Sequence, residues 1–105
     1  MILNGKARIE FKKWLENRYN LHFTEWSDFN TTCRNALIIE WFDSVGIYIG
    51  IEFYGSPEVE IKYESIVLTK GYDWYLQNQF SKIYLTRQEA TEKAIIKANK
   101  LYNNL

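Results

Sequence analysis

Hydrophobic positions recur with a helical period at both ends of the chain and with a period of two in the middle. The segment from Gly5 to Tyr19 predicts an amphipathic helix. Asn4 is its predicted N-cap, because an asparagine side chain can accept an unpaired backbone N–H of the first turn, and Asn20 is its predicted left-handed end. The face expected to pack consists of Ala7, Phe11, Trp14, Leu15, Arg18 and Tyr19.

The next stretch, LHFTEWSDFNTTCR, has no sustained period. Its aromatic residues Phe23, Trp26 and Phe29 are three positions apart, which predicts a short helical turn at the edge of the core. His22 lies beside apolar residues, so we expect it to pack rather than to act as a catalytic base.

The middle of the chain alternates between apolar and polar positions and is rich in branched and aromatic residues, which predicts strands. The predicted strands are ALIIEWF (36–42), VGIYIGIEFY (45–54), VEIKYESIV (59–67), YDWYL (72–76) and a short KIYL (82–85). In the second strand, one face consists of Val45, Ile47, Ile49, Ile51 and Phe53. Because the turns DSVG and GSPE are tight, the strands are expected to form an antiparallel meander of three to four strands.

A second helix is predicted at the end of the chain, in TRQEATEKAIIKANKLYNN. Thr86 and Glu89 form a capping box at its start. An apolar stripe that includes three small alanines is expected to dock on the sheet: Ala90, Ala94, Ile95, Ala98, Leu101, Tyr102 and Leu105. A second edge carries Lys93, Ile96, Lys97 and Lys100, and its alternatives are a solvated basic face or a partner-binding edge.

These elements predict an α+β fold of order α-β-β-β-(β)-α, with both helices on one face of the sheet. A length of 105 residues suits a single domain spanning 1–105, and an aromatic content of 17% supplies a core. Cys33 is the one cysteine, so no intramolecular disulfide is possible. Neither a signal peptide nor a membrane span is evident, so we expect a cytoplasmic protein with no membrane partner.

The formal net charge is zero, but the charge is unevenly distributed. Residues 1–35 carry six basic and four acidic groups, residues 36–80 carry two and seven, and residues 81–105 carry five and two. The ends are therefore basic and the middle is acidic. This distribution predicts a molecule with a basic helix side and an acidic sheet side.

The residue types disfavour most catalytic chemistry. One cysteine and one histidine are too few for a zinc site, and neither a P-loop nor a dinucleotide-binding glycine motif is present. Acidic residues of the predicted sheet are Glu52, Glu58, Glu60 and Glu64, with Lys62 among them. The favoured interpretation is that these residues form the solvated face of a half-buried sheet. The alternative is a weak Mg²⁺ site. We expect no enzyme activity and no catalytic, cofactor-binding or metal-binding residue.

Two segments, ALIIEWFDSVGIYIGI and KIYLTRQEATEKAIIKANKLYN, resemble small uncharacterised proteins of bacteriophages and mobile elements. The resemblance covers under half of the chain. It implies a phage-type accessory protein in the host cytoplasm, and it implies no activity or site residue.

Two functions compete on these patterns. The first is a non-enzymatic module that binds another protein or its own copy, because segregated charge favours electrostatic pairing. Its predicted contact residues are Lys93, Ile96, Lys97 and Lys100. The second is nucleic-acid binding through the basic helix side, because the element order matches that of double-stranded RNA-binding domains. It is the runner-up because the lysines come late in the last helix and the sheet region is acidic.

Overall fold

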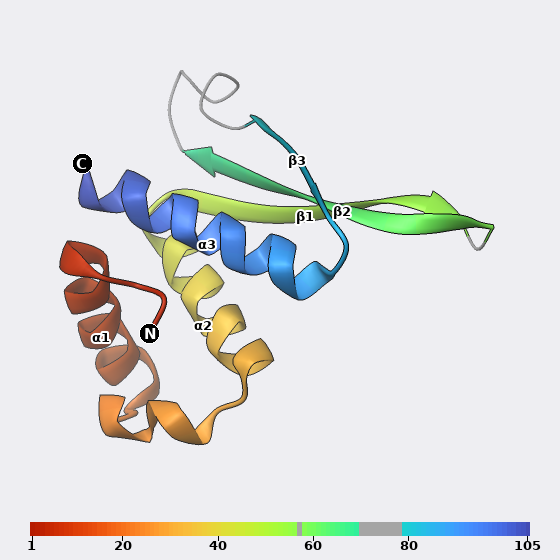
Figure 1. The fold of residues 1–105 in the computed structure, drawn as a ribbon. Coiled ribbons are helices and arrows are strands. Elements are labelled where there is room, and N and C mark those ends of the chain that lie inside the picture. Colours follow the sequence, from red (N-terminus) through yellow and green to blue (C-terminus); the bar gives the residue numbers. More distant parts are fainter. Residues whose placement is uncertain (57, 70–78) are drawn as a thin grey trace.

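Helices form one layer of the molecule and an antiparallel sheet forms the other (Figure 1). The computed structural model describes residues 1–56, 58–69 and 79–105. Its elements are α1 (Gly5–Tyr19), the 3-10 helix η1 (Phe23–Asp28), α2 (Thr31–Ser44), β1 (Ile47–Ser56), β2 (Val59–Thr69), β3 (Gln79–Tyr84) and α3 (Arg87–Asn103). The predicted α+β fold, with an antiparallel meander flanked by N-terminal and C-terminal helices, is confirmed.

The prediction of a strand at residues 36–42 is wrong, because these residues lie inside α2. The side chain of Asn30 caps this helix by accepting the backbone N–H of Cys33 at 2.9 Å. Its buried residues are Ile38, Trp41 and Phe42. Their spacing of three and four is helical, but a short run of branched and aromatic residues is equally typical of a buried strand.

The strand order is β1-β2-β3, and both pairings are antiparallel. The predicted strands at 45–54, 59–67 and 82–85 correspond to β1, β2 and β3, whereas the prediction at 72–76 lies outside the described residues. In the long β1–β2 hairpin, Glu52 is opposite Glu64 and Phe53 is opposite Tyr63. A bulge interrupts this register at Gly55, which has a φ of 124°.

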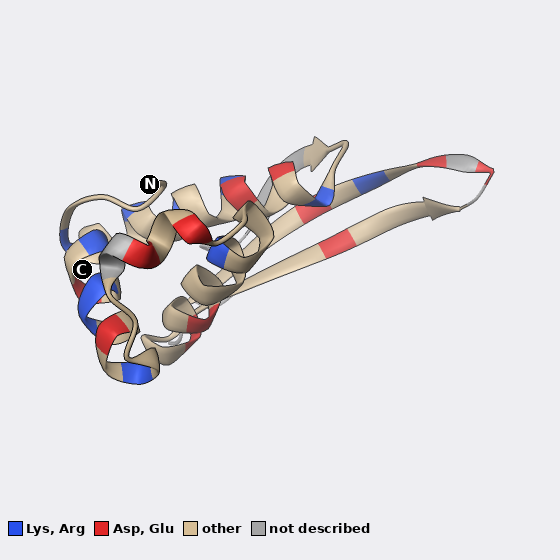
Figure 2. Cartoon of the chain, turned by 90° about the horizontal axis from the view of Figure 1, so that it is seen from below, with Lys and Arg blue, Asp and Glu red and all other residues tan. Residues whose placement is uncertain are grey.

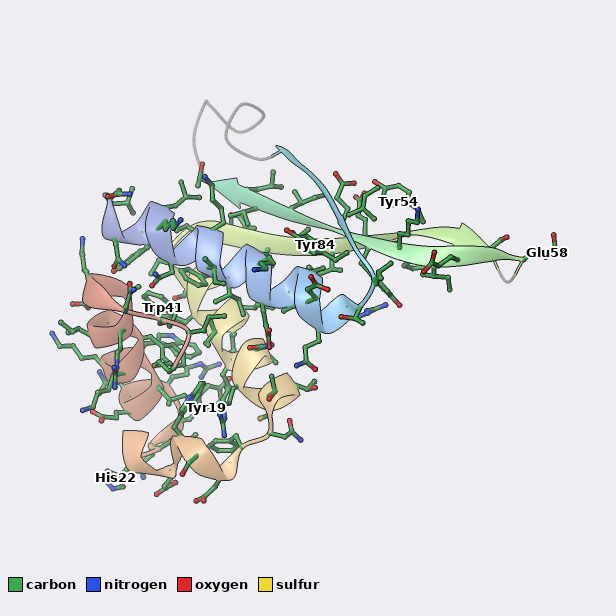
Figure 3. All side chains as sticks on the ribbon, in the orientation of Figure 1. Tyr19, His22, Trp41, Tyr54, Glu58 and Tyr84 are labelled. Atoms are coloured by element: carbon green, nitrogen blue, oxygen red, sulfur yellow. The ribbon has the colours of Figure 1, made fainter. Side chains whose placement is uncertain are left out.

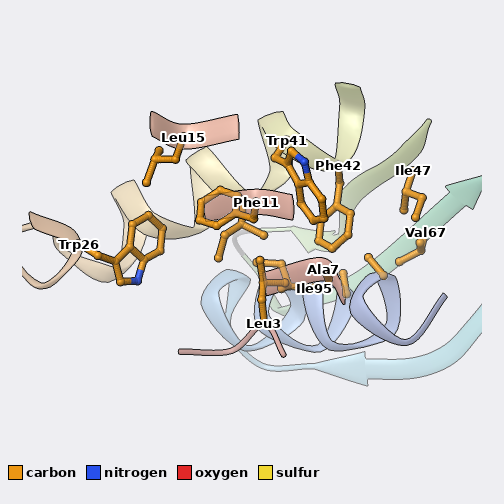
Figure 4. Close-up of a cluster of buried hydrophobic side chains, with 13 residues drawn as sticks. Leu3, Ala7, Phe11, Leu15, Trp26, Trp41, Phe42, Ile47, Val67 and Ile95 are labelled. Atoms are coloured by element: carbon orange, nitrogen blue, oxygen red, sulfur yellow. The ribbon is translucent and has the colours of Figure 1, made fainter. Parts of the chain in front are cut away.

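Aromatic side chains from α1, η1 and α2 meet in the core (Figure 4), and Tyr102 of α3 packs against them. The centroid of the Phe11 ring lies 5.2 Å from that of Trp26 and 5.8 Å from that of Trp41. The ring centroids of Trp41 and Tyr102 are 4.9 Å apart. Trp26 belongs to η1, so the predicted helical turn at the edge of the core is confirmed. The same cluster continues to Ile47 on the sheet, and α1 therefore lies on the same side of the sheet as α3.

A cluster of asparagines joins the two ends of the chain. Asn4 occupies the N-cap position of α1, but its side chain does not cap that helix. Instead, Asn103 Oδ1 accepts the N–H of Ala7 at 2.8 Å, and the side chains of Asn99 and Asn103 donate to Asn4 Oδ1 at 2.8 and 3.0 Å. Gly5 permits this approach, because it has a φ of 58° and a Cβ there would lie 3.2 Å from Asn103 Nδ2.

Helix α3 docks on the sheet through the predicted alanines, and Ala90, Ala94 and Ala98 are fully buried. Its start is capped as predicted, because Thr86 Oγ1 accepts the N–H of Glu89 at 3.1 Å. Ser65 is buried on β2, and its hydroxyl makes no hydrogen bond with the described residues. Small residues on both elements therefore allow the close contact between helix and sheet.

Candidate functional site

The distal half of the β1–β2 hairpin extends beyond the helical layer (Figure 1). We call this part, residues 52–56 and 58–62, the arm. It carries large apolar side chains in solvent: Phe53 is 61% exposed, Tyr54 is 49% exposed and Ile61 is 43% exposed. Groups of exposed apolar side chains are typical of interaction surfaces, which makes the arm the principal candidate site.

The arm has two different faces. Strand alternation places Phe53 and Ile61 on the face that, at the base of the hairpin, buries Ile47 and Val67. The predicted facing of Phe53 is therefore right, but the part of this face that carries Phe53 and Ile61 is left uncovered. The helices end before the hairpin does.

At the root of the arm, α3 begins beneath the sheet. The guanidinium carbon of Arg87 lies 5.8 Å from the centroid of the Tyr63 ring, a cation–π contact. Arg87 also borders a groove of about 380 Å³ between α2 and α3. Its other lining residues are Thr32, Asn35, Ala36, Ile39, Gln88 and Thr91. The groove lies next to the root of the arm, on the side of the helices. It is a second candidate contact surface and, unlike the arm, it is concave.

On the opposite face of the arm, Tyr54 points away from the helices (Figure 3) and contacts two carboxylates. Its hydroxyl donates to Glu64 Oε2 at 2.5 Å and also lies 3.3 Å from Glu52 Oε2. The hydrogen bond to Glu64, followed by a smaller desolvation effect, raises the pKa of Tyr54 to about 12. A phenol that keeps its proton so firmly is unsuited to act as a base or nucleophile near neutral pH. The cluster is better suited to accept hydrogen bonds or cations.

Acidic side chains dominate the arm and its root (Figure 2). The predicted acidic residues Glu52, Glu58, Glu60 and Glu64 all lie here, together with Lys62. Across 1–56, 58–69 and 79–105, no three His, Cys, Asp or Glu side chains are grouped closely enough to hold a metal ion. The separation of charge runs from the acidic arm toward α1 and the C-terminal half of α3, in a molecule that measures 45 × 35 × 18 Å.

The predicted contact residues on α3 form one exposed edge. Lys93, Ile96 and Lys100 are exposed, with 39% of Ile96 in solvent, and Lys97 is half-buried. None of these residues borders the arm or the α2–α3 groove. They remain a separate candidate surface, and their partner-binding role stays a prediction.

His22 does not pack as expected. It is exposed at the start of η1, far from the arm (Figure 3). Nearby, the Tyr19 hydroxyl donates to Glu40 Oε2 at 2.5 Å and ties α1 to α2; this bond, followed by desolvation, raises the pKa of Tyr19. Desolvation and then the neighbouring charge of Glu40 raise the pKa of Asp43. None of Tyr19, Glu40 and Asp43 lines the groove between α2 and α3.

The sequence patterns did not lead us to predict the arm, although the lengths of β1, β2 and α3 indicate it. Strands of ten and eleven residues are about 33–36 Å long, whereas the seventeen residues of α3 span about 25 Å. A helix of that length cannot cover such strands completely. The acidic residues near the GSPE turn are a second signal, because they suit solvent better than a core.

Comparison of the chain with protein-family models, with curated proteins and with solved structures found no match. Within the described ranges, no helix has both the length and the apolar character needed to cross a bilayer.

Proposed function

We propose that this protein is a non-enzymatic protein-binding module and that the arm is its main contact element. The observation that carries the proposal is the exposure of Phe53 and Ile61 on an arm that projects past the helices. Aromatic side chains at an accessible position are typical anchors of protein interfaces. As part of this proposal, the module is a phage-type accessory protein that acts in the host cytoplasm, and the resemblance of two of its segments to such proteins supports this assignment.

The α3 edge is the proposed second contact. Lys93, Ile96, Lys97 and Lys100 combine positive charge with one exposed apolar side chain. An acidic arm at one end and a basic edge elsewhere favour steered, salt-dependent association with a partner or with another copy.

The arm is tested by affinity capture from host lysate with a matched pair of variants. Phe53→Ser combined with Ile61→Ser removes the apolar side chains of the arm. Ile9→Ser is the control, because Ile9 is 58% exposed on α1, away from the arm. We expect the arm variant to lose a partner that the wild type and the control retain. A partner captured equally by all three proteins, or by none, contradicts the role of the arm.

Self-association is tested separately by sedimentation velocity at low and high salt. Opposite charges attract most strongly at low ionic strength, so oligomers are expected there and should dissociate as salt is raised. Lys97→Glu combined with Lys100→Glu should weaken them. A monomer at every salt concentration removes the version in which the partner is a second copy.

Nucleic-acid binding is the second candidate, and the specific observation in its favour is that basic groups gather on α1 and α3. Lys6 lies 5.2 Å from the ring centroid of Tyr102, so the basic first turn of α1 lies against the last turns of α3. Fluorescence anisotropy with labelled duplex RNA and DNA at low salt tests this function. No binding at about 10⁻⁴ M protein, the weak limit of non-specific affinity, eliminates it.

A further inference from the structure

Strand β1 has one free edge. It is the outer strand of the sheet, nine of its ten residues pair with β2 on one side, and no described strand pairs with its other side. Alternate residues of an edge strand direct their N–H and C=O groups outward, away from the sheet. From Ile49 to Tyr54, β1 therefore offers backbone donors and acceptors along about 20 Å.

The side chains of β1 define what could pair there. On the helix-facing side, Ile49 and Ile51 are half-buried and Phe53 is exposed, so that side is apolar and becomes more open toward the arm. On the other side, Glu52 is opposite Glu64, and the two carboxylates share one hydroxyl, that of Tyr54. Like charges that face each other across strands are unfavourable.

No cation among the described residues lies within salt-bridge distance of Glu52 or Glu64. A strand added beside β1 would place its side chains about 5 Å from those of β1, measured between Cβ atoms. A lysine or arginine next to Glu52 would thus relieve the repulsion between the carboxylates. An apolar residue at the next position would cover Ile51 or Phe53.

We propose that the free edge of β1 accepts an extended segment of a different protein in which basic and apolar residues alternate. This inference rests on the proposed protein-binding function and specifies its partner class. Backbone hydrogen bonds supply affinity, and the alternating side chains supply specificity. The basic residues of the added segment would lie beside the carboxylates of Glu52 and Glu64. Its apolar residues would lie beside Ile49, Ile51 and Phe53.

A second copy is the disfavoured occupant. Symmetric antiparallel pairing of two β1 strands brings both Glu52 carboxylates close together across the new strand pair. A charged residue on an edge strand is a common means of preventing such self-pairing. Charge complementarity therefore favours a basic strand of another protein over a second β1 strand as the occupant of this edge.

The first measurement compares labelled peptides by fluorescence anisotropy. The probes are Lys-Ile-Lys-Val-Lys-Ile-Lys, its charge-reversed form with glutamate for lysine, and a scramble of the first peptide that breaks the alternation. We expect the alternating basic peptide to bind at least about tenfold more tightly than either other peptide, which corresponds to ~1.4 kcal/mol. Equal binding of the two basic peptides overturns the proposal, because charge alone would then explain the affinity.

N-methylation of the peptide tests whether backbone pairing occurs. Only one alternate set of amides in an added strand faces β1. Methylating that set should abolish binding, and methylating the other set should leave it nearly unchanged. Equal effects of the two modifications overturn strand addition.

The protein side is tested with Glu52→Lys, which should reverse the preference between the basic and the acidic peptide. Glu16→Lys on α1 makes the same change away from β1 and should leave the preference unaltered. Circular dichroism confirms that both variants are folded. An unchanged preference in Glu52→Lys contradicts the assigned site.

The outcomes separate this inference from the function on which it rests. If no peptide binds, but the arm variant still loses a captured partner, strand addition fails and protein binding stands. Dimers that Glu52→Lys strengthens, and that the peptide does not disrupt, overturn the choice of a different protein as occupant.

Discussion

Ile47 and Ile61 lie on the same face of one hairpin and have opposite surroundings. Ile47, at the base, is 3% exposed beneath the helices, whereas Ile61, on the arm, is 43% exposed. Both follow the same alternation of apolar and polar residues. The comparison teaches that alternation identifies the apolar face of a strand but does not reveal how far that face is covered.

The two halves differ in what surrounds them. The base is held by packing with α2 and α3, in a cluster that includes Phe42, Val67 and Ile95. The arm is held mainly by hydrogen bonding between its own two strands. A two-stranded hairpin with little hydrophobic support is only marginally stable in water. We therefore expect the base to determine global stability and the arm to determine binding.

The largest expected difference comes from one substitution made in both halves. Ile47→Ala should lower the free energy of unfolding by about 2–5 kcal/mol, because it leaves a cavity in the core. Ile61→Ala should lower it by about 0.5 kcal/mol or less, because its side chain is partly in solvent. Urea denaturation followed by tryptophan fluorescence measures both. Similar losses would mean that the arm is covered in solution.

The asparagine cluster joins α1 to α3 in the helical layer. Its loss should therefore lower the free energy of unfolding and leave the arm unchanged. Asn103→Ala removes the acceptor of the Ala7 N–H and a donor to Asn4, at an expected cost of about 1–3 kcal/mol. Asn104→Ala is the control, because Asn104 is exposed and its side chain has no hydrogen bond among those found. Thermal unfolding measures stability. An equal effect of both variants would remove the assigned role of the cluster.

Gly55→Ala should disturb the arm alone. Gly55 has a φ of 124°, and a Cβ there would lie 2.8 Å from the carbonyl oxygen of Glu60, so we expect a local cost of about 1–2 kcal/mol. Gly50→Ala is the matched control, because its new Cβ would lie at an ordinary 4.0 Å from Ile66. Amide hydrogen exchange should rise in the arm of the first variant only. Faster exchange at the base would show that the two halves unfold together.

The smallest expected effect is the titration of Tyr54 on the arm. Its folded pKa, about 12, is above the ordinary value of 10, so the stabilisation from its hydrogen bond is complete below pH 10 and is lost as the pH rises through 12. Glu64→Gln should bring the pKa of Tyr54 back toward 10. NMR of ¹³C-labelled tyrosine follows this titration directly. A pKa near 10 in the unaltered protein would contradict the Tyr54–Glu64 contact.

The features that could be predicted from the sequence are likewise the local ones. Helices α1 and α3 could be predicted because their apolar periods, the Thr86 cap and the left-handed Asn20 are local features. α2 could not, because residues 36–42 carry apolar side chains with either period. The exposure of the Lys93–Lys100 edge of α3 was also a local inference, since a docked helix leaves its polar stripe in solvent.

The fold class, the meander and the two terminal helices follow from the amino-acid sequence, because period, caps and turns act over a few residues. The packing of distant elements establishes where the helices stop covering the sheet, which edge of β1 is free, and that Asn103 rather than Asn4 caps α1. These features depend on the relative positions of elements distant in the chain. The candidate site belongs to the second group, because it is formed by the absence of a covering helix and not by a motif.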